Sequence, residues 1–387
     1  MKKVSNIKSK KPTVFVGVSG GVDSSVSAAL LQKAGFNVVG VFIKVWTPDF
    51  IDCTWKEERL DAMRVCAHLH IPFKTLDLER EYKKEVVDYM VAEYRSGRTP
   101  NPDVMCNKHI KFGAFYDWAM KNGADYVATG HYAQVSDRRG LHPSSLRSYG
   151  RASADKAEKS KEVGMLASTD KNKDQTYFLW TLPQTKLQKT LFPVGHLKKV
   201  QVRVLAKKFS LPTAIKKDSQ GLCFMGKVDI KDFLAHFIEK KEGKVIDEKG
   251  KVIGRHQGAF YYTLGERHGF DIKVKTTTDK PYYIVSKDLV KNTLTVSSKA
   301  WQEKTIGDHK IIYINLLNRI NDWPVNRKLL ARIRYRQTLE KCLLEKVSDN
   351  LYKVKFEQDQ NAVALGQSLV LYNKNICLGG GVICAWE

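Results

Sequence analysis

The stretch TVFVGVSGGVDSSVSAALLQKAG, residues 13–35, decides the fold of the first half of the chain. It begins with a mostly apolar, β-branched run without polar alternation, which predicts a strand buried on both faces. Gly20 and Gly21 interrupt this run, and apolar residues at helical spacing follow until Gly35. We therefore expect a strand, a glycine turn and a helix, in that order.

Strand and helix patterns alternate along the next hundred residues. Strands are expected at 38–46, 73–78 and 126–133, and helices at 57–70 and 81–95. This alternation predicts βαβ units and an α/β fold with a doubly wound parallel sheet. Ligands of such sheets bind beyond the carboxyl ends of the strands, at the point where the strand order reverses.

The second half of the chain has a different pattern. Residues 136–164 are polar, basic and low in complexity, which predicts a long mobile loop. Hairpin patterns follow at 244–253 and 282–296, and short alternating strands dominate from about 305 onward. We expect three domains: a catalytic domain over 1–226, a small central domain over 227–296, and a C-terminal β-barrel over 297–387.

The composition limits the partners. Lys and Arg number 65 against 41 Asp and Glu, a net charge of +24 that a polyanion would relieve. Nucleic acid is the first candidate, an anionic membrane surface the second, and a protein that is merely basic the third. The chain has no run of eighteen apolar residues and no secretory pattern at its start. Seven Cys without a CxxC pair fit a reducing, cytoplasmic compartment rather than a disulfide scaffold.

The glycine turn after the first strand is a candidate phosphate site. Its glycines expose backbone N–H groups, and the helix that follows adds a partial positive charge. SGGVDS lacks the Gly-Lys-Ser/Thr of a Walker loop and resembles the pyrophosphate loop of ATP pyrophosphatases (PP-loop proteins). That resemblance implies ATP and assigns Mg²⁺ to Asp23. The expected nucleotide-binding residues are Gly17, Val18, Ser19, Gly20, Gly21, Val22, Asp23, Ser24, Ile43 and Gly130.

Two cysteines stand in glycine- or proline-containing segments with basic neighbours. Cys106 follows an irregular loop, before a helix expected from about Lys108, and Lys108 and Lys111 would favour its thiolate. Cys223 lies in a second turn, DSQGLCF, which follows two lysines. Because the two are far apart in sequence, only the fold could bring them together.

The motifs occur in a recognisable order. SGGVDSS, GRTPNPDVMCNKHIKF, TGHYA, KDQTYFL, LFPVG, KKDSQGLCF, YTLGERHG, RYRQ and CLGGG follow one another as in the bacterial tRNA-specific 2-thiouridylases, which this chain resembles over nearly its whole length. It departs from them in the loop at 136–164, which looks longer than usual, and at Glu266, where family members commonly carry Gln.

The resemblance implies a reaction. ATP adenylates the 2-oxygen of the wobble uridine in the tRNAs for Lys, Glu and Gln, and pyrophosphate leaves. Sulfur arrives as a persulfide on Cys223 from a cysteine desulfurase or a sulfur-relay protein. Cys106 is the nucleophile that releases this sulfur, with Asp103 beside it, and a disulfide between the two cysteines can result.

The resemblance also implies the tRNA contacts. Asn101, Pro102 and Asp103 would lie against the flipped target base. Further tRNA-binding residues are His131, Lys173, Asp174, Gln175, Arg334, Tyr335 and Gln367. In an expected strand at 329–337, Arg332, Arg334 and Arg336 share one face, which predicts a row of guanidiniums for phosphates or else a solvated face.

Three alternatives remain open from the residues. Asp103, Cys106 and Cys223 could be three ligands of an iron–sulfur cluster, although clusters usually take thiolates. Another PP-loop synthetase that transfers nitrogen to tRNA or forms an amide would need no pair of reactive cysteines. A basic RNA-binding protein without catalysis would leave the phosphate loop idle.

Overall fold

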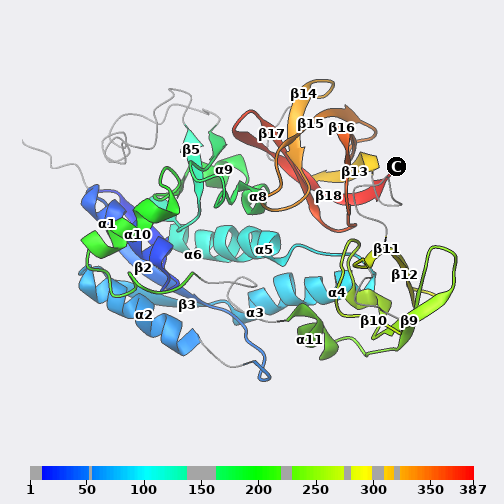
Figure 1. The fold of residues 1–387 in the computed structure, drawn as a ribbon. Coiled ribbons are helices and arrows are strands. Elements are labelled where there is room, and N and C mark those ends of the chain that lie inside the picture. Colours follow the sequence, from blue (N-terminus) through cyan, green and yellow to red (C-terminus); the bar gives the residue numbers. More distant parts are fainter. Residues whose placement is uncertain are drawn as a thin grey trace, which may run out of the picture. The chain divides into compact units, whose positions relative to one another are not determined.

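The computed structural model describes residues 11–51, 55–136, 163–218, 229–273, 280–298, 309–317 and 323–387 (Figure 1). The chain divides into two compact units, and each is described by itself. Unit 1 consists of Met1–Lys83, Cys106–Gln220 and Asn375–Cys377, and unit 2 of Lys84–Met105, Gly221–Lys374 and Leu378–Glu387. The three-domain division, with borders near 226 and 297, remains a prediction.

Unit 1 is built on a five-stranded parallel sheet with the order β3-β2-β1-β4-β7. Its strands are β1 (Thr13–Gly17), β2 (Asn37–Lys44), β3 (Phe73–Asp77), β4 (Tyr126–Ala128) and β7 (Thr190–Leu191). The strand order reverses at β1, so the carboxyl ends of β1 and β4 lie side by side. The strand expected at 126–133 is shorter, ending at Ala128, and the two-residue β7 carries too little pattern to be expected from the sequence.

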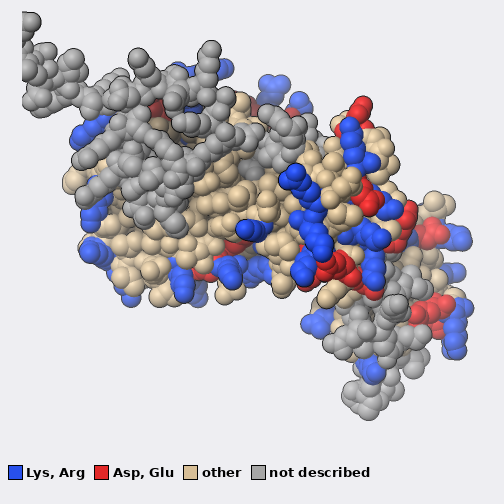
Figure 2. Space-filling model, turned by 90° about the horizontal axis from the view of Figure 1, so that it is seen from above, with Lys and Arg blue, Asp and Glu red and all other residues tan. Residues whose placement is uncertain are grey.

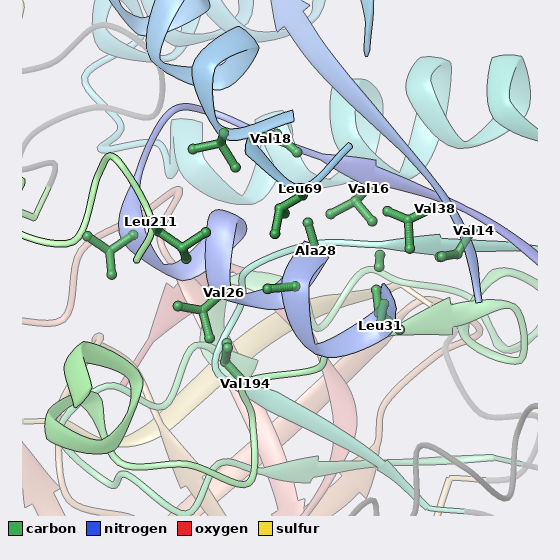
Figure 3. Close-up of a cluster of buried hydrophobic side chains, with 14 of the residues drawn as sticks. Val14, Val16, Val18, Val26, Ala28, Leu31, Val38, Leu69, Val194 and Leu211 are labelled. Carbon is green, nitrogen blue, oxygen red and sulfur yellow. The ribbon is translucent and has the colours of Figure 1, made fainter. Parts of the chain in front are cut away.

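The main helices of unit 1 are α1 (Val22–Lys33), α2 (Trp55–His68), α6 (Tyr116–Lys121) and α10 (Lys199–Lys208), with short helices α3 (Glu79–Tyr82), α8 (Thr176–Leu179) and α9 (Gln184–Leu187). They cover both faces of the sheet. Val14 and Val16 of β1 belong to a buried cluster with side chains of α1, α2 and α10 (Figure 3). Between them Phe15 points the other way and contacts Trp118 of α6, with 5.7 Å between ring centroids. The α/β, doubly wound fold is thereby confirmed.

A small antiparallel pair completes unit 1. β5 (Ala133–Ser136) pairs with β6 (Gly164–Ala167), and β6 pairs in turn with Ile376 and Cys377 of β18. Ser136 and Gly164, the two ends of the expected mobile loop, are partners in this register. Residues 137–162, between them, lie outside the described residues.

The helix that contains Cys106 begins earlier than expected. It starts with α5 (Pro102–Met105) and continues as the π-helical η2 (Cys106–Phe115), rather than starting near Lys108. The Oδ1 atom of Asn101 accepts a hydrogen bond from the N–H of Val104 at 3.2 Å, as an N-cap does. Pro102 takes the first helical position, where its missing N–H costs nothing. The expectation of a loop up to Cys106 is wrong, and this side chain is buried.

Unit 2 contains a further helical segment and a five-stranded sheet. The helices are α4 (Tyr89–Arg95), α11 (Ile230–Ala235) and the 3₁₀ turn η4 (Ala259–Tyr261), while the π-helical η1 (Lys83–Asp88) precedes α4. The sheet has the order β10-β9-β8-β12-β11, with β8 (Gly243–Ile246), β9 (Val252–His256), β10 (Asp271–Ile272), β11 (Tyr283–Asp288) and β12 (Thr293–Ser297). The two expected hairpins are confirmed as β8–β9 and β11–β12.

The last part of unit 2 is a closed six-stranded β-barrel, as expected. Its strands follow the order β13-β16-β15-β14-β17-β18, and β18 pairs back with β13. They are β13 (His309–Leu317), β14 (Lys328–Arg332), β15 (Glu340–Lys346), β16 (Leu351–Gln360), β17 (Ser368–Asn373) and β18 (Ile376–Trp386). Their inward side chains, such as Ile314, Leu344, Val354 and Leu371, form a separate buried cluster.

The prediction that Arg332, Arg334 and Arg336 form a row of guanidiniums on one strand face is wrong. β14 ends at Arg332, and Arg336 has a positive φ of 66°, so the alternation of a strand does not continue. Arg332 is buried, and its Nε and Nη2 atoms donate to the hydroxyl of Tyr372 at 3.0 and 2.6 Å. A hydrogen-bond partner on another strand therefore decides the place of Arg332.

Candidate active site

The turn after β1 is fixed by its backbone. The N–H of Val18 donates to the carbonyl of Val41 at 2.8 Å, which continues the strand register by one residue. Gly20 then adopts a φ of +70°, and a Cβ there would lie 2.6 Å from the carbonyl oxygen of Glu58. Gly21 is the N-cap residue of α1, without a side-chain cap for the first N–H groups of the helix. These N–H groups remain directed toward the loop, as an anion site requires.

Three serines in the first turns of α1 donate to backbone carbonyls near the helix start. The hydroxyls of Ser24 and Ser25 donate to the carbonyl of Gly21 at 3.1 and 2.7 Å, and that of Ser27 donates to the carbonyl of Asp23. Such bonds are the usual way in which serines are accommodated inside a helix. Ser19, in contrast, is exposed at the tip of the turn.

The end of β4 lies directly against this turn. A Cβ on Gly130 would approach the backbone nitrogen of Ser24 to 2.6 Å and the carbonyl carbon of Asp23 to 2.8 Å. Gly130 is therefore required for close contact between the segment after β4 and the first turn of α1. The sequence suggested a different reason for this glycine, the close approach of a ligand. Ile43 of β2 is buried at 5% exposure. Its contact with an adenine remains a prediction.

The carboxylate of Asp23 is held by two side chains. The hydroxyl of Tyr132 donates to Oδ1 at 2.9 Å, and Nζ of Lys199 lies 2.7 and 2.8 Å from the two carboxylate oxygens. Burial and the neighbouring Asp23 carboxylate raise the pKa of Tyr132, so its phenol stays protonated and donates.

A second carboxylate, Asp218, shares Lys199. Nζ of Lys199 lies 2.9 Å from Asp218 Oδ1, and Nζ of Lys173 lies 2.8 Å from Oδ2. Arg203 also pairs with this carboxylate and donates to the carbonyls of Ala214 and Lys216. Burial alone would raise the pKa of Asp218, but the hydrogen bonds from Lys173 and Lys199 outweigh it and hold this pKa well below its usual range.

Four members of this charged cluster were not among the residues predicted from the sequence. Tyr132 and Asp218 lie in the motifs TGHYA and KKDSQGLCF, so the motifs themselves were a signal. Lys199 and Arg203 lie on α10 among several other basic residues, and nothing local distinguishes them. Asp23, the carboxylate partner of Lys199, is 176 residues away, and only the fold brings it near.

The carboxylate of Asp23 suits a Mg²⁺ ion that is also bound to a nucleotide better than a metal site made of protein ligands alone. Among the residues that the structure describes, no three His, Cys, Asp or Glu side chains form a metal-holding group. Mg²⁺ is commonly held by one or two carboxylates together with phosphates and water. Asp23, with 30% of its side chain exposed at the phosphate loop, can supply such a carboxylate.

Of the two cysteines predicted to handle sulfur, only Cys106 lies among the described residues. Cys106 is buried in the first turn of η2. Cys223 lies outside the described residues, as does everything from 219 to 228, so the proposed pairing of the two cysteines remains a prediction. Asp218 is the last described residue before that segment, five positions from Cys223.

Comparison with known proteins decides the family. Three family models match consecutive parts of the chain: a tRNA methyl transferase HUP domain over residues 12–227, a tRNA methyl transferase PRC-barrel domain over 231–298, and an aminomethyltransferase beta-barrel domain over 309–383. The tRNA-specific 2-thiouridylase MnmA of Streptococcus agalactiae serotype III (strain NEM316) is 44% identical over 376 residues, covering 96% of this chain and 94% of that protein. The chain belongs to the tRNA-specific 2-thiouridylase family.

Other relatives agree with this assignment. The 2-thiouridylase of Streptococcus equi subsp. zooepidemicus (strain MGCS10565) is 43% identical over 377 residues, covering 96% of this chain and 95% of that protein. A solved structure, U34-tRNA thiolase NcsA from Methanococcus maripaludis with its [4Fe-4S] cluster, has a TM-score of 0.33 and 19% identity, covering 59% of this chain and 67% of that chain. That likeness is too small to bear on function. Among the described helices, none is long and apolar enough to cross a membrane.

The thiouridylase residues predicted to bind tRNA in unit 1 are largely engaged within the protein. His131 is buried, with Nδ1 2.8 Å from the Thr129 hydroxyl and Nε2 3.4 Å from Nζ of Lys111. Burial and the charge of Lys111 lower the pKa of His131, which keeps this imidazole neutral. The contacts of His131, Lys173, Asp174 and Gln175 with tRNA remain predictions.

The KDQ segment, residues 173–175, is also held by hydrogen bonds within the protein. The carboxylate of Asp174 accepts from the N–H of Ser168 and the hydroxyl of Thr176, so it stabilises the local turn. Gln175 and Tyr132 exchange two hydrogen bonds, one from each backbone N–H, both of 2.9 Å. This segment thereby positions Tyr132, and through it Asp23.

In unit 2 the predicted tRNA-binding residues come together around one barrel loop. Nε2 of Gln367 donates to the carbonyl of Pro100 at 3.0 Å, directly before Asn101. Nη2 of Arg334 donates to the carbonyl of Ala362, in the same barrel loop. Arg334 is exposed and Tyr335 is half-buried. On the face shown in Figure 2, Lys and Arg side chains are scattered over the described surface, and toward the right of the view Asp and Glu side chains lie among them.

Proposed function

We propose that this chain uses ATP to replace the 2-oxygen of the wobble uridine in tRNA with sulfur. The observation that carries the proposal is the meeting of the SGGVDS turn, Gly130 and the Asp23 carboxylate where the strand order of the sheet reverses. The similarity of this chain to proteins named tRNA-specific 2-thiouridylases supports the substrate class. The family models are named for methyl transfer, but we follow the relatives, because they match over nearly the full length of both chains.

In the first step the triphosphate of ATP binds at the N-terminus of α1. The N–H groups at the start of α1 and the partial charge of the helix would stabilise the phosphates. Mg²⁺, held by Asp23, would neutralise charge on the pyrophosphate. The 2-oxygen of uridine attacks the α-phosphate, pyrophosphate leaves, and the oxygen becomes part of an AMP leaving group.

In the second step a persulfide on Cys223 supplies sulfur. Its outer sulfur attacks the 2-carbon of uridine and displaces AMP. The thiolate of Cys106 then attacks the inner sulfur, which leaves thiouridine in the tRNA and a Cys106–Cys223 disulfide on the enzyme. A cellular thiol reductant returns both cysteines to thiols, and a cysteine desulfurase or sulfur-relay protein reloads Cys223.

The target uridine would be recognised outside its stack by Asn101, Pro102 and Asp103. Arg334, Tyr335 and Gln367 would contact the tRNA backbone, and the substrates would be the tRNAs for Lys, Glu and Gln. The excess of positive charge favours association with any tRNA, whereas the flipped base provides specificity.

The test is nucleoside mass spectrometry on tRNA incubated with the protein, Mg²⁺, a sulfur donor and ATP. We expect 2-thiouridine at the wobble position only when ATP, tRNA and the donor are all present, with pyrophosphate released. Release of pyrophosphate without sulfur incorporation would favour another PP-loop synthetase. An absorbing iron species in anaerobic preparations, lost on replacing Cys106, would favour a cluster-dependent thiolase.

A further inference from the structure

Lys199 lies at the centre of the charged cluster beside the phosphate loop. An ammonium group has three N–H donors. Two of them face the two oxygens of Asp23, at 2.7 and 2.8 Å, and the third faces Asp218 Oδ1 at 2.9 Å. All three donors of Lys199 are thus satisfied by carboxylates, and its side chain is only 14% exposed.

The cluster gathers several charges in a partly buried place. Lys173, Lys199 and Arg203 contribute three positive charges, and the carboxylates of Asp23 and Asp218 pair with them. A third carboxylate, Asp170, accepts a hydrogen bond from the backbone N–H of Lys199, so positive and negative charges are equal in number. The cluster lies beside the N-terminus of α1, which is itself partially positive. An anion entering the loop would therefore meet this helix end and the ammonium of Lys199.

We infer that Lys199 is a ligand of the β- and γ-phosphates of ATP, exchanged onto them from Asp23 when the nucleotide brings Mg²⁺ to that carboxylate. This inference rests on the proposed ATP-dependent function. It assigns to Lys199 a role outside the SGGVDS motif, and to the Asp23–Lys199 pair the role of a preformed contact that the substrate replaces.

The exchange follows from competition for one carboxylate. Both oxygens of Asp23 face Lys199 in this structure, and Mg²⁺ needs at least one of them. Two cations close to one carboxylate repel each other, which favours movement of the ammonium toward the phosphate oxygens. Asp218 keeps the third donor of Lys199, so the side chain remains anchored while two donors are redirected.

Neighbouring residues position Lys199 for this exchange. Its backbone N–H donates to Oδ2 of Asp170 at 2.9 Å, which fixes the first turn of α10. Lys173 and Arg203 hold Asp218, so the anchor carboxylate stays charged and in place. Tyr132 holds Asp23 by one oxygen and does not carry a competing charge. We therefore regard Asp218 and Tyr132 as positioning residues.

The decisive experiment compares ATP and AMP binding, by calorimetry with Mg²⁺ present, in the wild type and Lys199→Gln. Loss of a charged hydrogen-bond donor should weaken ATP binding about 10- to 100-fold. AMP has no β- or γ-phosphate, so its affinity should change less than about twofold. Lys208→Gln, an exposed lysine on the same helix, is the matched control and should change neither.

The outcomes are separable. If ATP and AMP affinities fall equally in Lys199→Gln, the residue has only a structural role and the inference is wrong. It is also wrong if ATP binding is unchanged. If the wild type itself binds no ATP, the proposed function fails, and this inference with it.

A second measurement tests the exchange without nucleotide. Mn²⁺ can replace Mg²⁺ and is followed by electron paramagnetic resonance. Because Lys199→Gln removes the cation that competes for Asp23, this variant should bind Mn²⁺ alone several-fold more tightly than the wild type. Equal or weaker Mn²⁺ binding would contradict the exchange, whatever the ATP result.

Discussion

Positively charged side chains are held in two different ways in the two units. Lys199 of unit 1 is paired with two carboxylates that are themselves about 30% exposed beside the phosphate loop. Arg332 of unit 2 is 5% exposed and donates twice to the neutral hydroxyl of Tyr372, which is fully buried in the barrel. The first cation faces partners that a ligand can replace, whereas the Tyr372 hydroxyl, buried in the barrel, is a partner that a ligand cannot reach.

This difference separates functional charge from structural charge. An ion pair near water can be exchanged for phosphate or Mg²⁺ at little cost, because both charges stay partly solvated. A buried guanidinium that loses its hydrogen bonds is left desolvated and unpaired. We therefore expect substitutions around Lys199 to change chemistry, and substitutions around Arg332 to change stability.

The largest effect should come from Asp23→Ala. Pyrophosphate release should fall at least about 100-fold, because the carboxylate expected to hold Mg²⁺ at the phosphates is gone. Binding of tRNA should stay near the wild-type value. The measurements are a tRNA-dependent pyrophosphate assay and filter binding with labelled tRNA.

Asp117→Ala provides a control, since that carboxylate is on the same unit and pairs with Lys186 at the surface. It should retain full turnover. Undiminished pyrophosphate release in Asp23→Ala would show that the cluster beside the loop is structural, and the contrast with the barrel would no longer hold.

Gly130→Ala should have the next largest effect, because the charged cluster around Asp23 depends on a fixed backbone at the start of α1. The added Cβ would lie 2.6 Å from a backbone nitrogen, which cannot yield as a side chain does. We expect a stability loss of about 1–3 kcal/mol together with weaker ATP binding. Gly17→Ala, where the nearest atom is 3.6 Å away, should unfold like the wild type. Equal denaturation midpoints for the two variants would contradict the close approach.

The parts that could be predicted from the sequence are those that the local chain determines. A β-branched run followed by two glycines and a helix start specifies β1, the turn and α1 wherever the rest of the chain lies. The hairpins β8–β9 and β11–β12 are equally local. Asn101 and Pro102 are a local helix-start signal too, and the loop expected up to Cys106 is wrong because Asn101 caps a helix that begins at Pro102.

The parts that could not be predicted depend on distant partners. Three alternating arginines, beginning with the last residue of β14, suggest a strand face, but the buried hydroxyl of Tyr372, forty residues further on, holds Arg332. Lys199 is one lysine among many on a basic helix until the fold brings it to Asp23. Neither the contact of Arg332 with Tyr372 nor that of Lys199 with Asp23 can be predicted from residue type and spacing.

A pH experiment should show whether the ion pairs of unit 1 act through charge. The folded-state pKa of Asp218 lies below its ordinary value of 3.8, so its ion pairs stabilise fully above about pH 4 and progressively less as the pH falls below that. Asp218→Asn should therefore be less stable than the wild type at pH 7, and the difference should shrink as the pH falls from about 5 to 3. Urea unfolding across this range provides the measurement, and a pH-independent difference would mean that Asp218 does not act through charge.

The smallest effect should distinguish two arginines only two residues apart. Arg334 is exposed, so Arg334→Ala should weaken tRNA binding by about fivefold, close to one hydrogen bond, and reduce the log–log salt slope by roughly 0.7–0.9, the value for one phosphate. Arg332→Met should leave that slope unchanged and instead lower stability by about 1–3 kcal/mol, because Tyr372 loses its charged partner. Titrating tRNA at several salt concentrations, alongside urea unfolding, separates the two quantities. If Arg332→Met changes the slope while Arg334→Ala does not, the buried guanidinium must reach tRNA after a rearrangement, and burial in this structure would no longer distinguish structural from functional charge.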